Sequence, residues 1–333
     1  MKINLSDFAK SKILVIGDIM LDCYLWGKVE RISPEAPVPI VQVLKRTYML
    51  GGAGNVALNL ASIGCKTDIM AVCGNDKAGS QLQQMLNENK ITSHLIFDDS
   101  YLTISKTRIM ALEQQLLRID EERIQTLQSG LKDYLLSKLR EIIVSYNAVI
   151  LSDYGKGLLK TPNITNSIIS ICKENNIFVF VDPKGKDWER YKYATCVTPN
   201  SAELNLVANE TIETEDELIV VSERIIKEYS LEWLLVTRGS KGMCLTQGDT
   251  CKKTCSDNSS YPSPLIISTQ ARQVYDVSGA GDTVISVLAA GVSIGLSFQD
   301  AAMVANKAAG VVVGKLGTQP ITKDELEVVL LNP

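Results

Sequence analysis

Residues 276–283 have the sequence Asp-Val-Ser-Gly-Ala-Gly-Asp-Thr, and residues 284–290 continue as Val-Ile-Ser-Val-Leu-Ala-Ala. The small residues leave backbone amides free to point at an anion, and the apolar run predicts a helix whose positive dipole end lies at the same place. Asp282 puts a carboxylate inside this anion site, and the motif holds no cation to pair with it. A base beside a transferring phosphoryl group explains both features better than a helix N-cap does.

Apolar runs that favour β-strands alternate with helical patterns along the chain. The runs are Ile13–Ile16, Ile69–Val72, Ala148–Leu151, Ile177–Val181 and Trp233–Val236. Because their apolarity is continuous, both faces of the sheet should be covered, as in a parallel sheet between helix layers. The pattern predicts a three-layer α/β fold. Residues 37–44 and 103–120 alternate instead, which predicts exposed antiparallel strands.

Polar residues follow the predicted strands where each strand ends. They are Asp18, Asp153, Asp182, Lys184, Asn200 and Thr237. Open α/β sheets bind ligands beyond the carboxyl ends of their strands, so these side chains should meet at one rim. Ordinary helix capping remains an alternative, above all for Asp153.

The bulk properties limit the class of protein. A chain of 333 residues fits one α/β domain, and its net charge of −4 is interspersed, so no basic stripe suggests a nucleic-acid partner. The apolar run at 284–296 is too short to cross a membrane. The first seven residues lack the pattern of a signal peptide, and we expect a cytoplasmic protein.

Cysteine and histidine usage argues against several kinds of site. The eight cysteines lack Cys-x-x-Cys spacing, and the one close pair, Cys251 and Cys255, has no histidine nearby, so a structural zinc site is not expected. These two cysteines belong to residues 246–264, a polar segment that we interpret as a surface loop. His94 is the single histidine, which excludes His-based triads and favours a structural role for it.

Three motifs resemble those of the PfkB (ribokinase-like) family of sugar and nucleoside kinases. The stretch 276–282 resembles the family signature Asp-Thr-x-Gly-Ala-Gly-Asp, Gly51–Asn55 its amino-terminal glycine motif, and Thr198–Glu203 its Asn-x-x-Glu motif. The resemblance covers nearly the whole chain. It implies a single kinase domain over residues 1–333 with a ribokinase-like fold, and a small β-lid from about 19–50 and 98–120, often used for dimerisation. A homodimer through the lid is therefore expected.

Four further segments look like those of the D-glycero-β-D-manno-heptose-7-phosphate kinases. They are Arg31–Pro39, Leu151–Gly157, Val181–Gly185 and Gly310–Thr318. These kinases phosphorylate the anomeric C1 hydroxyl of a heptose 7-phosphate, which gives the 1,7-bisphosphate, in ADP-heptose and lipopolysaccharide synthesis. Many are fused to a nucleotidyltransferase with a His-x-x-His type motif. With His94 as the single histidine and an end at Pro333, we expect a stand-alone kinase.

The resemblance also implies roles for particular residues. Asp282 would accept the proton of the sugar hydroxyl, and the amides of Gly279, Ala280 and Gly281 would stabilise charge on the phosphoryl oxygens. Because the transition state is loose, positioning should outweigh basicity, so a low pKa at a helix start is tolerable. The residues matched to sugar hydroxyls are Asp18, Gly52 and Asn55.

ATP and Mg²⁺ are the expected cofactors. The residues matched to the phosphate-side loop and the adenine shelf are Thr237, Gly239, Gly242 and Asn306. Asn200 and Glu203 would act on Mg²⁺ through water, without a direct protein-only metal site. A requirement for a monovalent cation is left open.

The far phosphate of a heptose 7-phosphate needs cations. We expect Lys184 and Arg108 to hold it, with Lys106 and Arg118 behind them. An equally good explanation is that the lid cations keep an edge strand soluble.

Two other functions remain possible from the sequence. One is another kinase of the family, for ribose, fructose or a nucleoside, and the other is a non-catalytic sugar- or nucleotide-binding regulator. The matches at 33–37 and 182–185 argue against the first, and the retained Asp282 with its glycines argues against the second. A dehydrogenase is a poor candidate because Gly-x-Gly-x-x-Gly is missing after the first strand.

Overall fold

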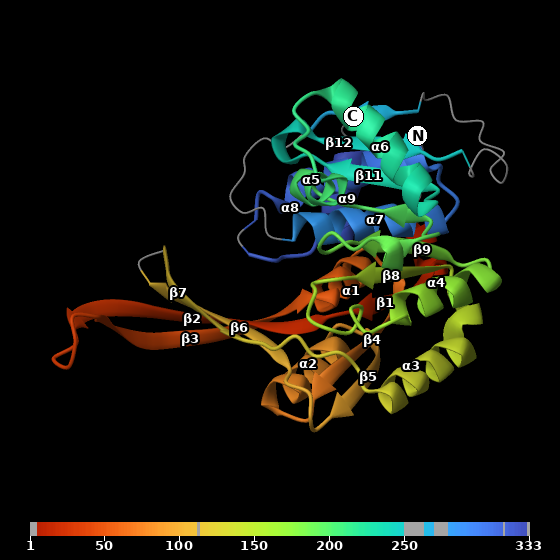
Figure 1. Cartoon of the computed structure of the whole chain (residues 1–333). Coiled ribbons are helices and arrows are strands. Elements are labelled where there is room, and N and C mark those ends of the chain that lie inside the picture. Colours follow the sequence, from red (N-terminus) through yellow and green to blue (C-terminus); the bar gives the residue numbers. More distant parts are fainter. Residues whose placement is uncertain (1–4, 112–113, 250–262, 270–278, 316, 332–333) are drawn as a thin grey trace.

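A nine-stranded sheet forms the centre of the described part of the protein (Figure 1). The computed structural model describes residues 5–111, 114–249, 263–269, 279–315 and 317–331. The strands are β1 (Lys12–Gly17), β4 (Lys66–Gly74), β5 (Thr92–Asp98), β8 (Ala148–Ser152), β9 (Phe178–Asp182), β10 (Cys196–Val197), β11 (Trp233–Thr237), β12 (Met243–Gln247) and β13 (Leu265–Ile267). Their order is β13-β12-β11-β10-β9-β8-β1-β4-β5; β12 pairs antiparallel with both β11 and β13, and the other neighbouring strands pair in parallel.

Each central strand is buried on both faces, as the continuous apolar runs predicted. In β1, Ile13 and Val15 belong to one buried cluster, whereas Leu14 and Ile16 belong to another on the opposite face. Successive side chains of a strand point to opposite sides, so two helix layers must cover the sheet. The three-layer α/β fold is therefore confirmed.

The helices divide between these two clusters. The first contains residues of α1 (Ala53–Ser62), α2 (Lys77–Glu88), α7 (Ala280–Ser293), α8 (Phe298–Val312) and α9 (Lys323–Leu331). The second contains residues of α3 (Ser129–Ile142), α4 (Ile164–Glu174), α5 (Ser201–Ala208) and α6 (Glu215–Tyr229). Short 3₁₀ turns are η1 (Leu5–Lys10), η2 (Ile143–Ser145), η3 (Glu189–Tyr191) and η4 (Gly239–Lys241). In the described residues, no helix combines the length and the apolarity that crossing a bilayer requires.

A second sheet of four strands, the lid, extends away from the body as a long arm (Figure 1). Its order is β3 (Pro39–Gly52), β2 (Ile19–Ile32), β6 (Ile104–Ala111) and β7 (Gln114–Glu121). The predicted antiparallel strands are present, because β3 pairs antiparallel with β2 and β6 pairs antiparallel with β7, whereas β2 and β6 pair in parallel. β2 follows β1, and β6 follows β5. Because β1 and β5 run parallel in the central sheet and end at the same edge, the two segments that follow them leave the body in the same direction.

The cysteines that the structure describes are buried and free, consistent with small core residues. They are Cys23, Cys65, Cys73, Cys172, Cys196 and Cys244. The close pair Cys251 and Cys255 lies outside the described residues, as does most of the predicted loop between β12 and β13.

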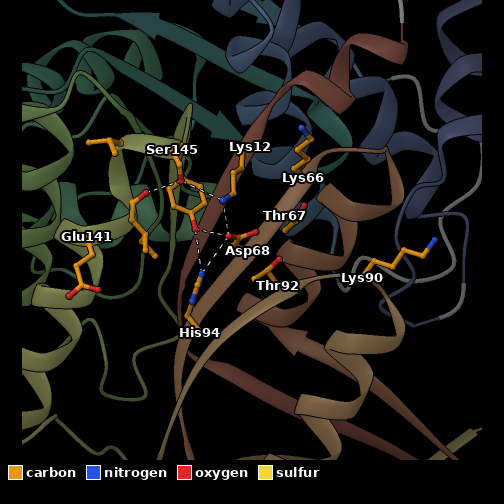
Figure 2. Close-up of a pocket in the computed structure, with 12 residues that line it drawn as sticks. Lys12, Lys66, Thr67, Asp68, Lys90, Thr92, His94, Glu141 and Ser145 are labelled. Carbon is orange, nitrogen blue, oxygen red and sulfur yellow. Dashed lines mark hydrogen bonds and ion pairs between the residues drawn. The ribbon is translucent and has the colours of Figure 1, made fainter.

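A buried ionic cluster lies at the amino ends of β1, β4 and β5, the edge opposite the strand ends that carry the predicted site. Lys12 and His94 converge on Asp68 in a cavity of about 610 Å³ (Figure 2). Tyr146 donates to Asp68 over 2.6 Å, and the Lys12 ammonium is 3.2 Å from the same carboxylate oxygen. Burial alone would raise the pKa of Asp68, but its three donors outweigh burial and lower that pKa to about 2.

This cluster predicts how stability depends on pH. Asp68→Asn should lower the free energy of unfolding by about 2 kcal/mol at pH 7, the worth of a hydrogen-bonded buried charge. Because the folded pKa of Asp68 lies below the unfolded value of about 3.9, the contribution is present above about pH 4 and is lost as the pH falls toward 2. Urea unfolding of both proteins across this range measures the difference. Asp7→Asn, which removes an exposed ion pair with Lys10, is the control and should change little. If the difference in the free energy of unfolding between Asp68→Asn and the wild type did not change with pH, the carboxylate of Asp68 would not stabilise the fold through its charge.

Candidate active site

A cavity at the carboxyl ends of the strands lies between β11, α5, α7 and α8. Its volume is about 700 Å³. Every residue predicted to bind nucleotide lines it: Asn200, Glu203, Thr237, Gly239, Gly242 and Asn306. Asn306 also donates to the backbone oxygen of Ser268 over 2.8 Å, which ties α8 to the segment after β13. The structure thus brings together residues that are far apart in the sequence.

The Asn200–Glu203 motif forms the start of α5. The Asn200 side chain accepts from the backbone N–H of Glu203, and the Glu203 side chain accepts from the backbone N–H of Asn200, which is a capping box. The second carboxylate oxygen of Glu203 lies 3.0 Å from the ammonium of Lys184. Lys184 lines the smaller cavity that contains Asp282, and its ion pair with Glu203 brings it to the border of the nucleotide cavity.

A smaller cavity of about 170 Å³ adjoins the first and contains Asp282. The residues that line both cavities are Asp182, Asn200, Glu203 and Gly281. A Cβ atom built on Gly281 would meet no protein atom within 4 Å, so the backbone there faces open space. The two cavities meet at the amino end of α7, and Asp282 lines only the smaller one.

Asp282 is held by two other parts of the chain. Asn55, in α1, donates to one carboxylate oxygen over 2.6 Å, and the hydroxyl of Tyr154, after β8, donates to the other over 2.9 Å. Gly279 precedes α7 with φ of 80°, which orients the first turn. Residues 276–278 of the quoted stretch lie outside the described residues.

The pKa of Asp282 is raised, contrary to the expectation from its place at a helix start. Burial raises the pKa to about 6, although Asn55 and Tyr154 both donate to the charged form. Only 4% of the residue is exposed, so desolvation dominates over the local dipole. A carboxylate with this pKa is ionised at neutral pH and is a better base than an exposed aspartate.

Gly52 lies where β3 turns into α1, close to the smaller cavity. Its φ of 58° is unfavourable for residues with a side chain, and a Cβ atom there would overlap the backbone oxygen of Asp18. The glycine motif therefore brings the start of α1, with Asn55, against the end of β1.

The carboxylate of Asp18 is committed to the backbone. It accepts from the amides of Tyr154, Lys156 and Leu158 over 3.2, 2.8 and 3.2 Å. Burial raises the pKa of Asp18 to about 6, and these amides counteract the rise. Asp18 was predicted to bind a sugar hydroxyl, and most of its acceptor capacity holds the loop after β8 instead.

Two further acidic residues at the site were not among the predicted binding residues. Asp22 in β2 is 4% exposed, contacts the position of Gly51 and forms an ion pair with Arg108. Asp182 lines both cavities, where burial and the nearby charge of Asp282 raise its pKa well above the usual value. The available signal for Asp22 was an acidic residue within an otherwise apolar strand, Ile19–Tyr24.

The predicted lid cations lie on one face of the lid, together with Asp22. Arg108 is directly opposite Arg118, and Lys106 is opposite Asp120 and beside Asp22. Each already has a carboxylate partner: Lys106 with Asp120 and Glu122, Arg118 with Asp120, and Arg108 with Asp22. Two arginines opposite each other are unfavourable by themselves, so an anion near them would be stabilising. Lys184 stands apart, paired with Glu203.

A nucleotide-sized cavity that meets a buried carboxylate at a helix start defines a phosphotransferase of the α/β class. The family described as pfkB family carbohydrate kinase matches residues 10–325, and the chain belongs to this family. The matched region is accordingly a carbohydrate kinase domain.

Named relatives and solved structures agree with this family. The chain is 44% identical over 323 residues to "Bifunctional protein HldE" of Actinobacillus pleuropneumoniae and 43% identical over 323 residues to that of Haemophilus influenzae (strain PittEE). Each match covers 97% of this chain and 64% of the relative, so the chain spans less than two thirds of their length.

Solved structures resemble the fold. Phosphofructokinase-2 from Escherichia coli in complex with potassium has a TM-score of 0.77 at 17% identity, over 96% of this chain and 98% of that one. Ribokinase from Arabidopsis thaliana, complexed with ribose and ATP, has a TM-score of 0.72 at 19% identity, also over 96% and 98%. At these identities the likeness shows the ribokinase-like fold alone.

The geometry of Asp282 predicts its kinetic signature. Asp282→Asn should lower turnover by roughly 10² to 10⁴, the usual worth of a general base, with ATP and sugar binding nearly intact. In the wild type, kcat/KM should fall as the pH drops through about 6, where Asp282 becomes protonated, and the residual activity of the variant should lack this limb. Steady-state kinetics across pH tests both points. Near-normal turnover in a folded variant would remove Asp282 from catalysis.

Proposed function

We propose that the protein transfers the γ-phosphoryl group of ATP to the anomeric C1 hydroxyl of D-glycero-β-D-manno-heptose 7-phosphate. The product is the 1,7-bisphosphate, an intermediate of ADP-heptose and lipopolysaccharide core synthesis. The observation that carries the reaction type is Asp282, buried and held by both oxygens where the two cavities meet. The identity to proteins named HldE and the resemblance to heptose 7-phosphate kinases support the substrate.

In the proposed reaction, the C1 oxygen attacks the γ-phosphorus while the bond to the ADP oxygen breaks. Asp282 accepts the hydroxyl proton. The backbone amides of Gly279, Ala280 and Gly281 at the start of α7 face the transferring oxygens and stabilise their charge. Asp22 and Asn55 are placed to orient the sugar, because both lie near Asp282 on the substrate side.

The polar residues shared by the two cavities fit Mg²⁺ bound with ATP. Among the described residues, no three His, Cys, Asp or Glu side chains gather closely enough to hold a metal ion by themselves. Asn200 and Glu203 use part of their acceptor capacity for the capping box, so they suit contact through metal-bound water. When bound, Mg²⁺ would neutralise charge on the ATP phosphates.

We place the 7-phosphate against the lid face that carries Arg108, Arg118 and Lys106. The opposed arginines support this placement, since they would lose their mutual repulsion. Lys184 lies beside Glu203 and is better placed for the phosphates of ATP. One observation favours an alternative kinase for an unphosphorylated sugar: each of these four cations is already paired with a carboxylate.

We also propose that the lid forms a homodimer. The lid face opposite the cations carries Tyr48, Leu117 and Ile119, which are 37%, 54% and 46% exposed. Register places these residues on the side of Cys23 and Thr107, away from Asp22. Exposed apolar side chains along projecting strands are a common dimer surface.

A cytoplasmic location stays a prediction.

The proposed magnesium role predicts a selective effect of Glu203→Gln. This variant should raise the Mg²⁺ concentration for half-maximal rate by about tenfold, more than it raises the sugar KM, because an outer-shell carboxylate is lost. Glu217→Gln, which alters the same kind of capping box at α6, is the matched control and should leave the Mg²⁺ requirement unchanged. Magnesium titrations of the three proteins decide the point. Equal curves would leave Glu203 as a structural cap.

The substrate proposal predicts that lid cations discriminate between sugars. Arg108→Met should lower kcat/KM for heptose 7-phosphate by roughly 10- to 100-fold and spare unphosphorylated heptose, since charge-assisted bonds to a phosphate are strong. Lys184→Met should affect both sugars alike. The ratio of kcat/KM values for the two sugars cancels any general loss of fold.

Lys28→Met is the control for this comparison, because Lys28 lies on the same lid and pairs with Glu30. It should leave the ratio unchanged. If the wild type shows no preference for the phosphorylated sugar, the heptose-phosphate assignment fails and a general sugar kinase takes its place.

A further inference from the structure

Tyr154 links two buried carboxylates, those of Asp282 and Asp18, beside the smaller cavity. Its hydroxyl donates to one oxygen of Asp282 over 2.9 Å, and its own backbone amide donates to Asp18 over 3.2 Å. Its ring lies against the turn at Gly52, 3.5 Å from where a Cβ atom would stand. The side chain therefore lines the cavity that holds the predicted base.

The loop that carries Tyr154 has little freedom. Asp18 accepts from three of its amides, at Tyr154, Lys156 and Leu158. Gly157 has φ of 139°, and a Cβ atom there would overlap the backbone of Gln125. These contacts fix the backbone of the loop, and from this backbone the hydroxyl of Tyr154 reaches Asp282.

We propose that Tyr154 is a positioning residue for phosphoryl transfer, which holds the Asp282 carboxylate so that a lone pair faces the acceptor hydroxyl. The proposal rests on the proposed role of Asp282 as the base. A carboxylate offers about four acceptor positions. Asn55 fills one on Oδ2 and Tyr154 fills one on Oδ1, so two hydrogen bonds restrain the rotation of a carboxylate that lines the smaller cavity.

Tyr154 remains a donor throughout the working pH range. Burial and the neighbouring charge of Asp282 raise the pKa of its phenol well above 10. A donor of this kind stabilises the charged carboxylate and limits the rise that burial imposes on Asp282. Loss of the hydroxyl should therefore raise the pKa of Asp282 further, a change that a merely structural tyrosine would not produce.

The test compares Tyr154→Phe with the wild type by two readouts. The first is the titration of the Asp282 carboxyl carbon by ¹³C NMR, with its signal assigned by its absence in Asp282→Asn. We expect the pKa of Asp282 to rise by about one pH unit. The second is kcat/KM with ATP and heptose 7-phosphate, expected to fall about tenfold at pH 8 and about fivefold more at pH 6.

Tyr146→Phe is the matched control, because Tyr146 donates to buried Asp68 in the same way at the opposite edge of the sheet. This variant should lose about as much stability as Tyr154→Phe does. It should keep the wild-type pKa of Asp282 and the wild-type fall of kcat/KM at low pH. Should Tyr154→Phe fold poorly, 3-fluorotyrosine at position 154 keeps the hydroxyl as a stronger donor, and the pKa of Asp282 should then fall.

The outcomes separate the two proposals. Suppose that Tyr154→Phe keeps the wild-type pKa of Asp282 and the wild-type fall of kcat/KM at low pH, while Asp282→Asn is inactive. This result would overturn the role of Tyr154 and leave the assignment of Asp282 as the base intact. Near-normal turnover in Asp282→Asn removes the base itself. If the wild type rejects heptose 7-phosphate, only the substrate assignment fails, because the NMR titration needs no substrate and still decides whether Tyr154 controls Asp282.

Discussion

The burial of one carboxylate, that of Asp282, organises the active end of this protein. A buried charge must be hydrogen-bonded, and here the donors come from α1 and from the loop after β8. The glycine turn that starts α1 and the loop tethered by Asp18 therefore have to meet the start of α7. The hydrogen bonds that hold Asp282 and the packing of α1 and α7 against the sheet therefore belong to the same arrangement.

The parallel sheet decides where everything else can lie. Its strands end at one edge, so the turns that follow them supply both cavities, and the two segments that leave β1 and β5 run outward together as β2 and β6. The lid consequently presents its polar face, with Asp22 and Arg108, to the same edge. The opposite edge carries the Asp68 cluster, where the Lys12 ammonium neutralises the carboxylate.

The cations predicted to bind a phosphate are neutralised by the protein before any ligand binds. The lid cations and Lys184 have carboxylate partners, so an incoming phosphate competes with protein carboxylates for them. Such exchange costs less than uncovering a bare charge and favours ligands that present a strong anion in the right place. Specificity for a phosphorylated sugar would then depend on geometry and not on excess positive charge.

Local pattern in the sequence was enough for the central strands and the helix at Ala280–Ser293, because apolar periodicity reports on neighbours in the chain. The residues that line the nucleotide cavity were predicted from the resemblance of short motifs to those of a known family. Tertiary structure alone decided the contacts between distant segments: Asn55 and Tyr154 on Asp282 span 227 and 128 residues, and Arg108 on Asp22 spans 86. The same holds for the parallel pairing of β2 with β6 and for the raised pKa of Asp282. Burial and long-range pairing depend on the whole fold, and no local stretch of sequence encodes them.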